Sequence, residues 1–261
     1  MNRWKTDEGD SKDQQFSVLS TYCLHADTIL VGFVDGLFKL VIHDDDTYDY
    51  YRVNYIERGR RSQFNRVYGI QRDGENSFFL ATKGGVIHYN FKTQKSQVFI
   101  HDPMAPNETI TNGFCRVSYK DRKGDFWFAS TEGLNILSKV NGKYAIRPHP
   151  MNSKITRASK NQITTICDDE KGNLYLGTFG SGVLYVDLTK KTVRIIDKKQ
   201  GLPNNVLYGL IKNGNKLWMS TNQGIASYDI TSKKINSYKA VSYTHLRAHE
   251  TREDRRLRHE G

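Results

Sequence analysis

The sequence predicts an all-β fold, a β-propeller made of four-stranded antiparallel blades. Within residues 201–238, four short runs alternate apolar and polar residues and are joined by hairpin turns, which is the pattern of an antiparallel meander. The same pattern occurs five times, at intervals of 43 to 49 residues. A period of this length with four strands per unit indicates radially stacked blades. One meander alone is too small to be stable, so we expect the units to pack against one another.

The five units share one register, so each unit can be identified by the same residue types at the same positions. The residue that ends the second strand follows a small residue, and a glycine comes three or four positions later. The small residues let neighbouring blades approach closely; they are Gly32, Ala81, Ala129, Gly177 and Ser220. Four units have an asparagine before the first strand, at Asn65, Asn112, Asn161 and Asn204. We interpret these asparagines as structural, because the side chain can hydrogen-bond backbone two residues further on.

This register sets the expected organisation of the chain. The blades are predicted at residues 16–56, 65–100, 112–148, 161–197 and 204–240. Residues 1–15 form a polar N-terminal remnant. Residues 241–261 lose the alternation and contain five arginines and no lysine. They resemble translated sequencing-adapter read-through, so we expect this tail to be non-native and the native sequence to be interrupted near residue 240.

Composition excludes several classes of function. The formal charge of +11 is spread over every repeat, and no recognition helix accompanies it, so we expect no bound nucleic acid. The sequence has no run of 18 apolar residues and no secretion signal.

Few residues suggest chemistry. The three cysteines have no metal-ligand spacing, and we interpret them as small core residues rather than catalytic thiols. The acidic run at residues 44–46 lacks the spacing of a calcium loop and is interpreted as a solvated turn. We find no catalytic constellation, so we expect no enzyme activity in this segment, no metal and no cofactor.

The stretch GLPNNVLYGLIKNGNKLWMSTNQGIASYD at Gly201–Asp229 resembles the two-component regulator propeller repeat, and Gly124–Leu137 and Gly172–Asp187 are weaker copies. The resemblance implies a periplasmic sensor region of a Bacteroidetes-type hybrid two-component system, whose parent protein is a dimeric histidine kinase and response regulator. It also implies an oligosaccharide ligand, and membrane contact only through other parts of the parent. The five blades would belong to a seven-bladed ring, because an incomplete ring leaves blade faces unpaired.

In a propeller, a ligand is expected on the face made by the loops that lead into each blade and the turns between second and third strands. On that face the candidate residues are Arg58, Arg60, Arg61, Arg157, Lys160 and Phe179. Arginine forks suit carboxylate or sulfate groups, so the predicted ligand is an anionic oligosaccharide. Two alternatives stay open: a protein-interaction scaffold, and a propeller lyase or glycosidase.

Overall fold

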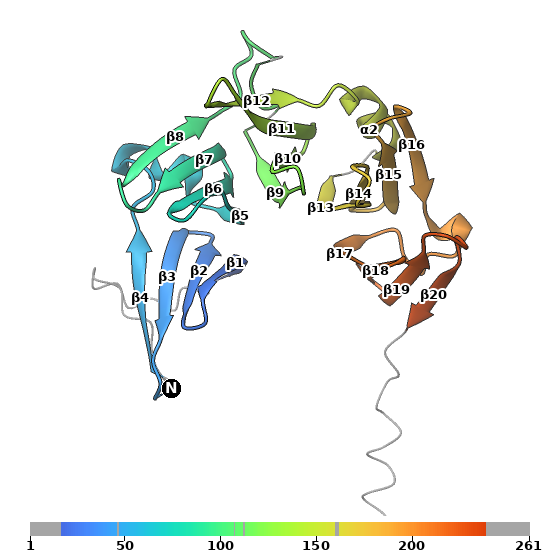
Figure 1. The fold of residues 1–261 in the computed structure, drawn as a ribbon, viewed down its shortest axis with the longest axis horizontal. Coiled ribbons are helices and arrows are strands. Elements are labelled where there is room, and N and C mark those ends of the chain that lie inside the picture. The colour runs from blue at the N-terminus through green and yellow to red at the C-terminus, as the bar shows by residue number, and fades with distance from the viewer. Residues whose placement is uncertain (1–16, 46, 107, 112, 160–161, 239–261) are drawn as a thin grey trace, which may run out of the picture. The chain divides into compact units, whose positions relative to one another are not determined.

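A computed structural model describes residues 17–45, 47–106, 108–111, 113–159 and 162–238. It confirms the predicted fold class, since the strands form five four-stranded antiparallel sheets in chain order (Figure 1). The chain divides into two compact units, residues 1–157 and residues 158–261, and each is described by itself. The predicted N-terminal remnant and the predicted non-native tail lie outside the described residues.

The first unit contains three blades. Blade one is formed by β1 (Val18–His25), β2 (Thr28–Phe33), β3 (Gly36–Ile42) and β4 (Tyr48–Val53). Blade two is formed by β5 (Val67–Arg72), β6 (Ser77–Thr82), β7 (Gly85–Asn90) and β8 (Lys95–Phe99). Blade three is formed by β9 (Cys115–Lys120), β10 (Phe126–Ser130), β11 (Gly133–Val140) and β12 (Lys143–Pro148).

The second unit contains two blades. Blade four is formed by β13 (Ile163–Asp168), β14 (Leu174–Thr178), β15 (Val183–Asp187) and β16 (Thr192–Ile196). Blade five is formed by β17 (Leu207–Asn213), β18 (Lys216–Thr221), β19 (Gly224–Asp229) and β20 (Ile235–Tyr238). A short 3-10 helix, η2 (Lys198–Gln200), lies on the connection between them.

The repeated glycine after the second strand is required by backbone geometry. Gly85 has a φ of 146°, and a Cβ at this position would lie 2.2 Å from the carbonyl oxygen of Phe99. Gly182 has a φ of 78°, and its Cβ would lie 2.3 Å from the carbonyl oxygen of Ile196. The fourth strand therefore crosses so close to this turn that a side chain is excluded.

The hydrophobic core lies between blades. Phe79 of blade two packs with Phe126 and Phe128 of blade three, and Tyr175 of blade four clusters with Leu217 of blade five. All five are at most 3 % exposed. This placement explains why a single meander is not self-sufficient: within each unit, a sheet buries a face against the neighbouring sheet.

Two connections that the sequence predicted as loops contain helices. Residues 58–64 form the 3-10 helix η1 (Arg58–Arg60) and one turn of helix, α1 (Arg61–Phe64). The loop before blade four contains α2 (Asn152–Ser159). Asn152 exchanges two side-chain hydrogen bonds of 2.9 Å with the backbone of Leu134, and Ile155 is fully buried, so this helix is tied to blade three. No helix among the described residues has the length and apolarity to cross a membrane.

The recurring asparagine has the predicted structural role at Asn204. Its side-chain oxygen accepts a hydrogen bond of 2.8 Å from the backbone N–H of Val206, two residues on. Asn112 and Asn161 lie outside the described residues, and no such bond forms at Asn65 in the described chain.

Candidate functional site

The arginines in the connection to blade two lie on one short helical segment. Arg61 donates a hydrogen bond of 2.9 Å from Nη2 to Oδ1 of Asn54, and the Arg60 guanidinium lies 5.3 Å from the centre of the Phe64 ring. Phe64 is buried, and its carbonyl oxygen accepts a 2.8 Å hydrogen bond from the hydroxyl of Tyr55. A guanidinium has five N–H donors, so most donors of Arg60 and Arg61 remain for a ligand. The side chain of Arg58 lies outside the described part.

The sequence analysis did not identify a further arginine near this segment. Arg52 donates from Nη1 to the carbonyl oxygen of Asp35 (2.6 Å) and from Nη2 to its carboxylate (2.5 Å), and its guanidinium lies 4.7 Å from the Phe38 ring. The partner carboxylate lies 17 residues away on the turn between β2 and β3. No local sequence signal joins the two. Because this guanidinium is already paired, it serves the blade rather than a ligand.

The remaining predicted residues belong to other connecting segments of the chain. Phe179 is 54 % exposed, and its backbone N–H donates to the carbonyl oxygen of Gln162 at 2.9 Å. The following Gly180 donates to the carbonyl oxygen of Asn205 at 3.1 Å, so this longer turn is held against the connection into blade five. Arg157 is exposed on α2, in the first unit, and Lys160 lies outside the described residues. Among the predicted residues of the first unit whose side chains are described, Arg60 and Arg61 share one segment and Arg157 lies on another.

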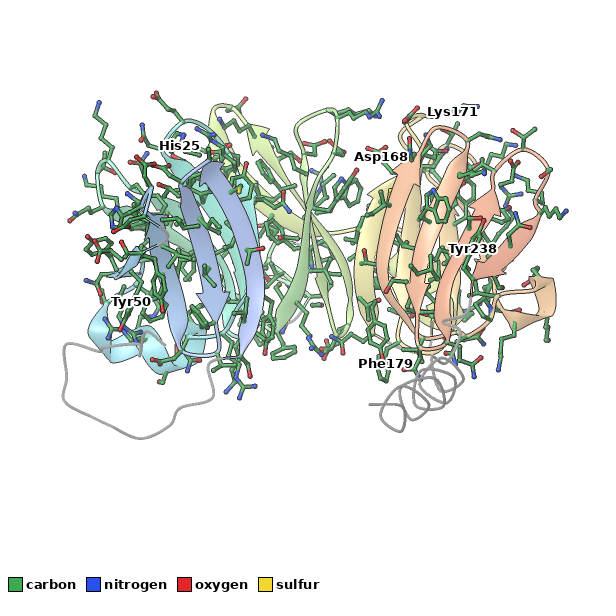
Figure 2. The ribbon with its side chains drawn as sticks, turned by 90° about the horizontal axis from the view of Figure 1, so that it is seen from below. His25, Tyr50, Asp168, Lys171, Phe179 and Tyr238 are labelled. Carbon is green, nitrogen blue, oxygen red and sulfur yellow. The ribbon has the colours of Figure 1, made fainter. Side chains whose placement is uncertain are left out.

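The second unit has a hollow between blades four and five that the sequence analysis missed. We call it the tyrosine cavity; its volume is about 720 Å³. It lies among the turn from β13 to β14, the turn from β17 to β18, and the outer strands. Its lining includes Tyr175, Tyr185, Tyr228, Arg194, Lys171 and Lys212. Lys171 and Phe179 lie at opposite ends of the strands of this unit (Figure 2), so the cavity is at the end away from the predicted binding turn.

Asp169 organises the wall of the tyrosine cavity. Its carboxylate accepts hydrogen bonds from Nδ2 of Asn173 (2.7 Å), from the hydroxyl of Tyr185 (2.9 Å) and from the backbone N–H of Lys171 (2.8 Å). Burial opposes ionisation, but these hydrogen bonds outweigh it and hold the pKa of Asp169 below its usual value. Burial, together with donation to Asp169, raises the pKa of Tyr185 to about 12. The wall is thus a fixed carboxylate with a neutral phenol in front of it.

A histidine, a carboxylate and a tyrosine meet at the interface of blades two and three. Nε2 of His88 lies 2.9 Å from Oδ2 of Asp73, and the Tyr144 hydroxyl donates to the other oxygen of the same carboxylate. The His88 ring stacks on Phe79 at 4.5 Å, and burial lowers the pKa of His88 more than Asp73 raises it. The imidazole is therefore neutral near pH 7 and packed among rings. The arrangement joins two blades and presents no free nucleophile.

The other sequence candidates have structural surroundings. Cys115 is fully buried, and burial raises its pKa to about 12, which agrees with a core position. Cys167 is half-buried and Cys23 is exposed, so the core interpretation is wrong for Cys23. Asp45 accepts hydrogen bonds from the backbone N–H and the hydroxyl of Thr47, so its carboxylate closes a turn. Among the described residues, no three histidine, cysteine or acidic side chains form a group that could hold a metal ion.

Comparison with known proteins gives this geometry a family context. Residues 158–180 match the two component regulator propeller family, which confirms the predicted resemblance. The matched residues lie in the fourth repeat rather than at Gly201–Asp229. The chain is also similar to histidine kinase P4 of Formosa agariphila, with 27 % identity over 177 residues, which is 66 % of this chain and 13 % of the kinase. The chain therefore spans a small part of that relative.

Solved structures agree on the fold. The extracellular domain of the putative hybrid two component system BT3049 from B. thetaiotaomicron aligns with a TM-score of 0.68 and 20 % identity, over 85 % of this chain and 30 % of that one. Virginiamycin B lyase from Staphylococcus aureus aligns with a TM-score of 0.57 and 11 % identity, over 86 % of this chain and 71 % of that one. At these identities both similarities concern the fold alone, so the lyase brings no catalytic role to these residues.

Proposed function

We propose that this chain is the ligand-sensing propeller region of a two-component signalling protein, and that it works in the periplasm. The similarity to a histidine kinase over two thirds of the chain carries the proposal, together with the regulator repeat at residues 158–180. A membrane sensor must bind its signal outside the compartment in which its kinase acts. A structural neighbour described as the extracellular domain of a hybrid two component system supports this placement.

The ligand we propose is an oligosaccharide with anionic groups. The support is local: Arg60 and Arg61 share one helical segment, and neither is paired with a carboxylate among the described residues. Arginine forks bind carboxylate and sulfate in a bidentate way. Phe179, Arg157, Arg58 and Lys160 remain candidates on the same kind of connecting segment. We expect the region itself to be non-catalytic and the parent protein to be a homodimer, in which ligand binding biases the arrangement of the two copies.

The test is calorimetric titration of the purified 261-residue chain with oligogalacturonides, sulfated heparin-derived oligosaccharides and neutral xylo-oligosaccharides. We expect an acidic oligosaccharide to bind and to be recovered unchanged by mass spectrometry. Replacing Arg58, Arg60 and Arg61 by Ala should weaken binding at least tenfold. The matched control replaces three exposed lysines of the same unit, Lys92, Lys95 and Lys123, by Ala and should leave binding within twofold.

Three results would contradict the proposal. If no oligosaccharide binds, the proposed class of ligand is wrong. Equal loss in both triple variants would mean that net charge, rather than the arginine segment, drives binding. Cleaved products in the mass spectrum would favour the lyase or glycosidase alternative. A protein-interaction scaffold would instead bind a partner protein and none of the sugars.

A further inference from the structure

The tyrosine cavity exists because one hairpin is shorter than its counterpart in another repeat. In blade three, β11 has 8 residues and pairs Lys139 with Tyr144 on β12. In blade five, β19 has 6 residues and the chain turns at Asp229, whose carbonyl oxygen accepts from the backbone N–H of Lys233. When the paired strands are aligned from Gly133 and Gly224, Ile235 corresponds to Ile146, so Lys233 stands at the position of Tyr144. The longer hairpin brings a ring to the neighbouring blade, and the shorter one does not.

The interface of blades two and three shows what the ring does. Tyr144 lies 4.9 Å from the Phe79 ring and 5.1 Å from the His88 ring, measured between centroids, and its hydroxyl reaches Asp73. The register places Tyr175 at the position of Phe79 and Tyr185 at that of His88. Tyr175 and Tyr185 contact each other at 4.9 Å between ring centroids, and among the described residues of blades four and five no third ring stands at the place of Tyr144. The space that Tyr144 fills in one interface is therefore open in the other.

The tyrosines that line the opening carry unused hydroxyl groups. Tyr175 and Tyr228 are 3 % and 8 % exposed and both line the cavity. Neither hydroxyl makes a hydrogen bond within the described part of the chain, whereas the hydroxyl of Tyr185 is held by Asp169. Two phenol groups beside the aliphatic side chains of Ile195, Ile196 and Ile230 are available to a ligand that has both a ring face and polar substituents.

The cavity also has an excess of positive charge. It carries four cationic side chains and two carboxylates, namely Lys171, Arg194, Lys212 and Lys233 against Asp169 and Glu170. Lys212 pairs with Glu170 at 2.8 Å, and Asp169 is fully hydrogen-bonded. The Arg194 guanidinium lies 4.8 Å from the Tyr185 ring and makes no hydrogen bond or ion pair to a described residue. At the equivalent position blade two has the neutral Gln97.

We infer that the tyrosine cavity binds a small ring-bearing carboxylate, with the ring against Tyr175 and Tyr228 and the carboxylate on Arg194. A volume of about 720 Å³ is within the range of small-molecule sites. A guanidinium that is stacked on an aromatic ring and has free donors suits a carboxylate. The site is distinct from the arginine segment of the first unit, so it does not depend on the oligosaccharide proposal.

Titration of the 261-residue chain with four probes tests the inference. Glucuronate represents sugar acids and benzoate represents aromatic acids; glucose and benzyl alcohol are their uncharged counterparts. We expect at least one carboxylate to bind at least tenfold more tightly than its uncharged counterpart. Which carboxylate binds identifies the source of the ligand. Binding of neither carboxylate, or equal binding of acid and neutral probe, would overturn the inference.

Variants locate the binding. Arg194→Gln introduces the residue of blade two at an exposed position, so the fold should persist, and it should weaken carboxylate binding at least tenfold. Tyr228→Phe keeps the ring and should weaken binding by a smaller factor. Lys190→Gln removes a cation of the same blade outside the cavity and should change binding less than twofold, as should the triple arginine variant of the first unit. If Arg194→Gln binds as tightly as the unchanged chain, the assignment is wrong.

Discussion

The close contact of blades one and two at Gly32 can be tested with one methyl group. A Cβ built on Gly32 would lie 2.5 Å from the carbonyl oxygen of Val67, on the next blade, and 2.4 Å from Oγ of Ser20. A carbon and a carbonyl oxygen normally approach to about 3.3 Å, so Gly32→Ala requires a shift of about 0.8 Å. The displaced atom is backbone, which cannot turn away as a flexible side chain can.

Two effects set the expected size of the destabilisation. Overpacking of a close contact costs about 1–3 kcal/mol. The methyl group also intrudes on the hydrogen bond of 2.9 Å that the Ser20 hydroxyl donates to the carbonyl oxygen of Val67, and a hydrogen bond contributes about 1 kcal/mol net. We therefore expect Gly32→Ala to lower the free energy of unfolding by roughly 2–4 kcal/mol. Ser20→Ala alone should lower it by about 1 kcal/mol.

Urea unfolding followed by far-ultraviolet circular dichroism measures these values. Gly74→Ala is the matched control, because a Cβ there meets nothing within 4 Å and its φ is not positive; it should be neutral or stabilising by up to about 1 kcal/mol. In the Ser20→Ala background, Gly32→Ala should lose the hydrogen-bond part of its effect and keep the overpacking part. A change below about 0.5 kcal/mol for Gly32→Ala, with an unchanged m-value, would refute the close-approach explanation.

Three further predictions concern buried polar groups. Burial lowers the pKa of His88 and of His149, so the free energy of unfolding should be highest above the ordinary histidine pKa of about 6.5 and should fall as the pH decreases below it. His88→Gln should make this fall smaller between pH 8 and 5. Equal slopes for the variant and the unchanged chain would contradict the prediction. Exposed Cys23 should react with Ellman's reagent at once, whereas Cys115, with its pKa near 12, should react only on unfolding; prompt labelling of both would place Cys115 outside the core. The buried Ser227 hydroxyl has no partner among the described residues, so Ser227→Ala should raise the free energy of unfolding by about 1 kcal/mol, and a loss in urea unfolding would reveal a hidden partner.

The sequence was sufficient for the fold because each blade is specified locally. Alternation gives the strands, and the glycine after the second strand gives the turn. Gly85, for example, has a φ of 146° beside the backbone of Phe99. The helix α2 was missed because its stability comes from tertiary contacts. Asn152 bonds to the backbone of Leu134, 18 residues away, and that pairing has no local signature.

The candidate site was less predictable than the fold. Cationic residues in connecting segments can be read directly, and Arg60 and Arg61 are indeed neighbours on one helical segment. The tyrosine cavity depends instead on the difference between two hairpins, one that carries Tyr144 and one that ends at Asp229. Each hairpin is unremarkable alone. The cavity appears only when their registers are compared, because a missing ring leaves no positive signal in the sequence.

A carboxylate that recurs at one repeat position illustrates how such differences arise. Each of Asp121 and Asp169 accepts backbone N–H groups of its own turn, which fixes the carboxylate in place. The side chain that donates the further hydrogen bond to this carboxylate differs between the blades. Trp127 donates from Nε1 at 2.9 Å in blade three, and Tyr185 donates from its hydroxyl at 2.9 Å in blade four. The turn around the aspartate is the same in both blades, while the aromatic side chain that donates to the carboxylate differs and changes the surface next to it. Binding chemistry in this chain is therefore expected where one repeat departs from the others, and Arg194 on the ring of Tyr185 is such a departure.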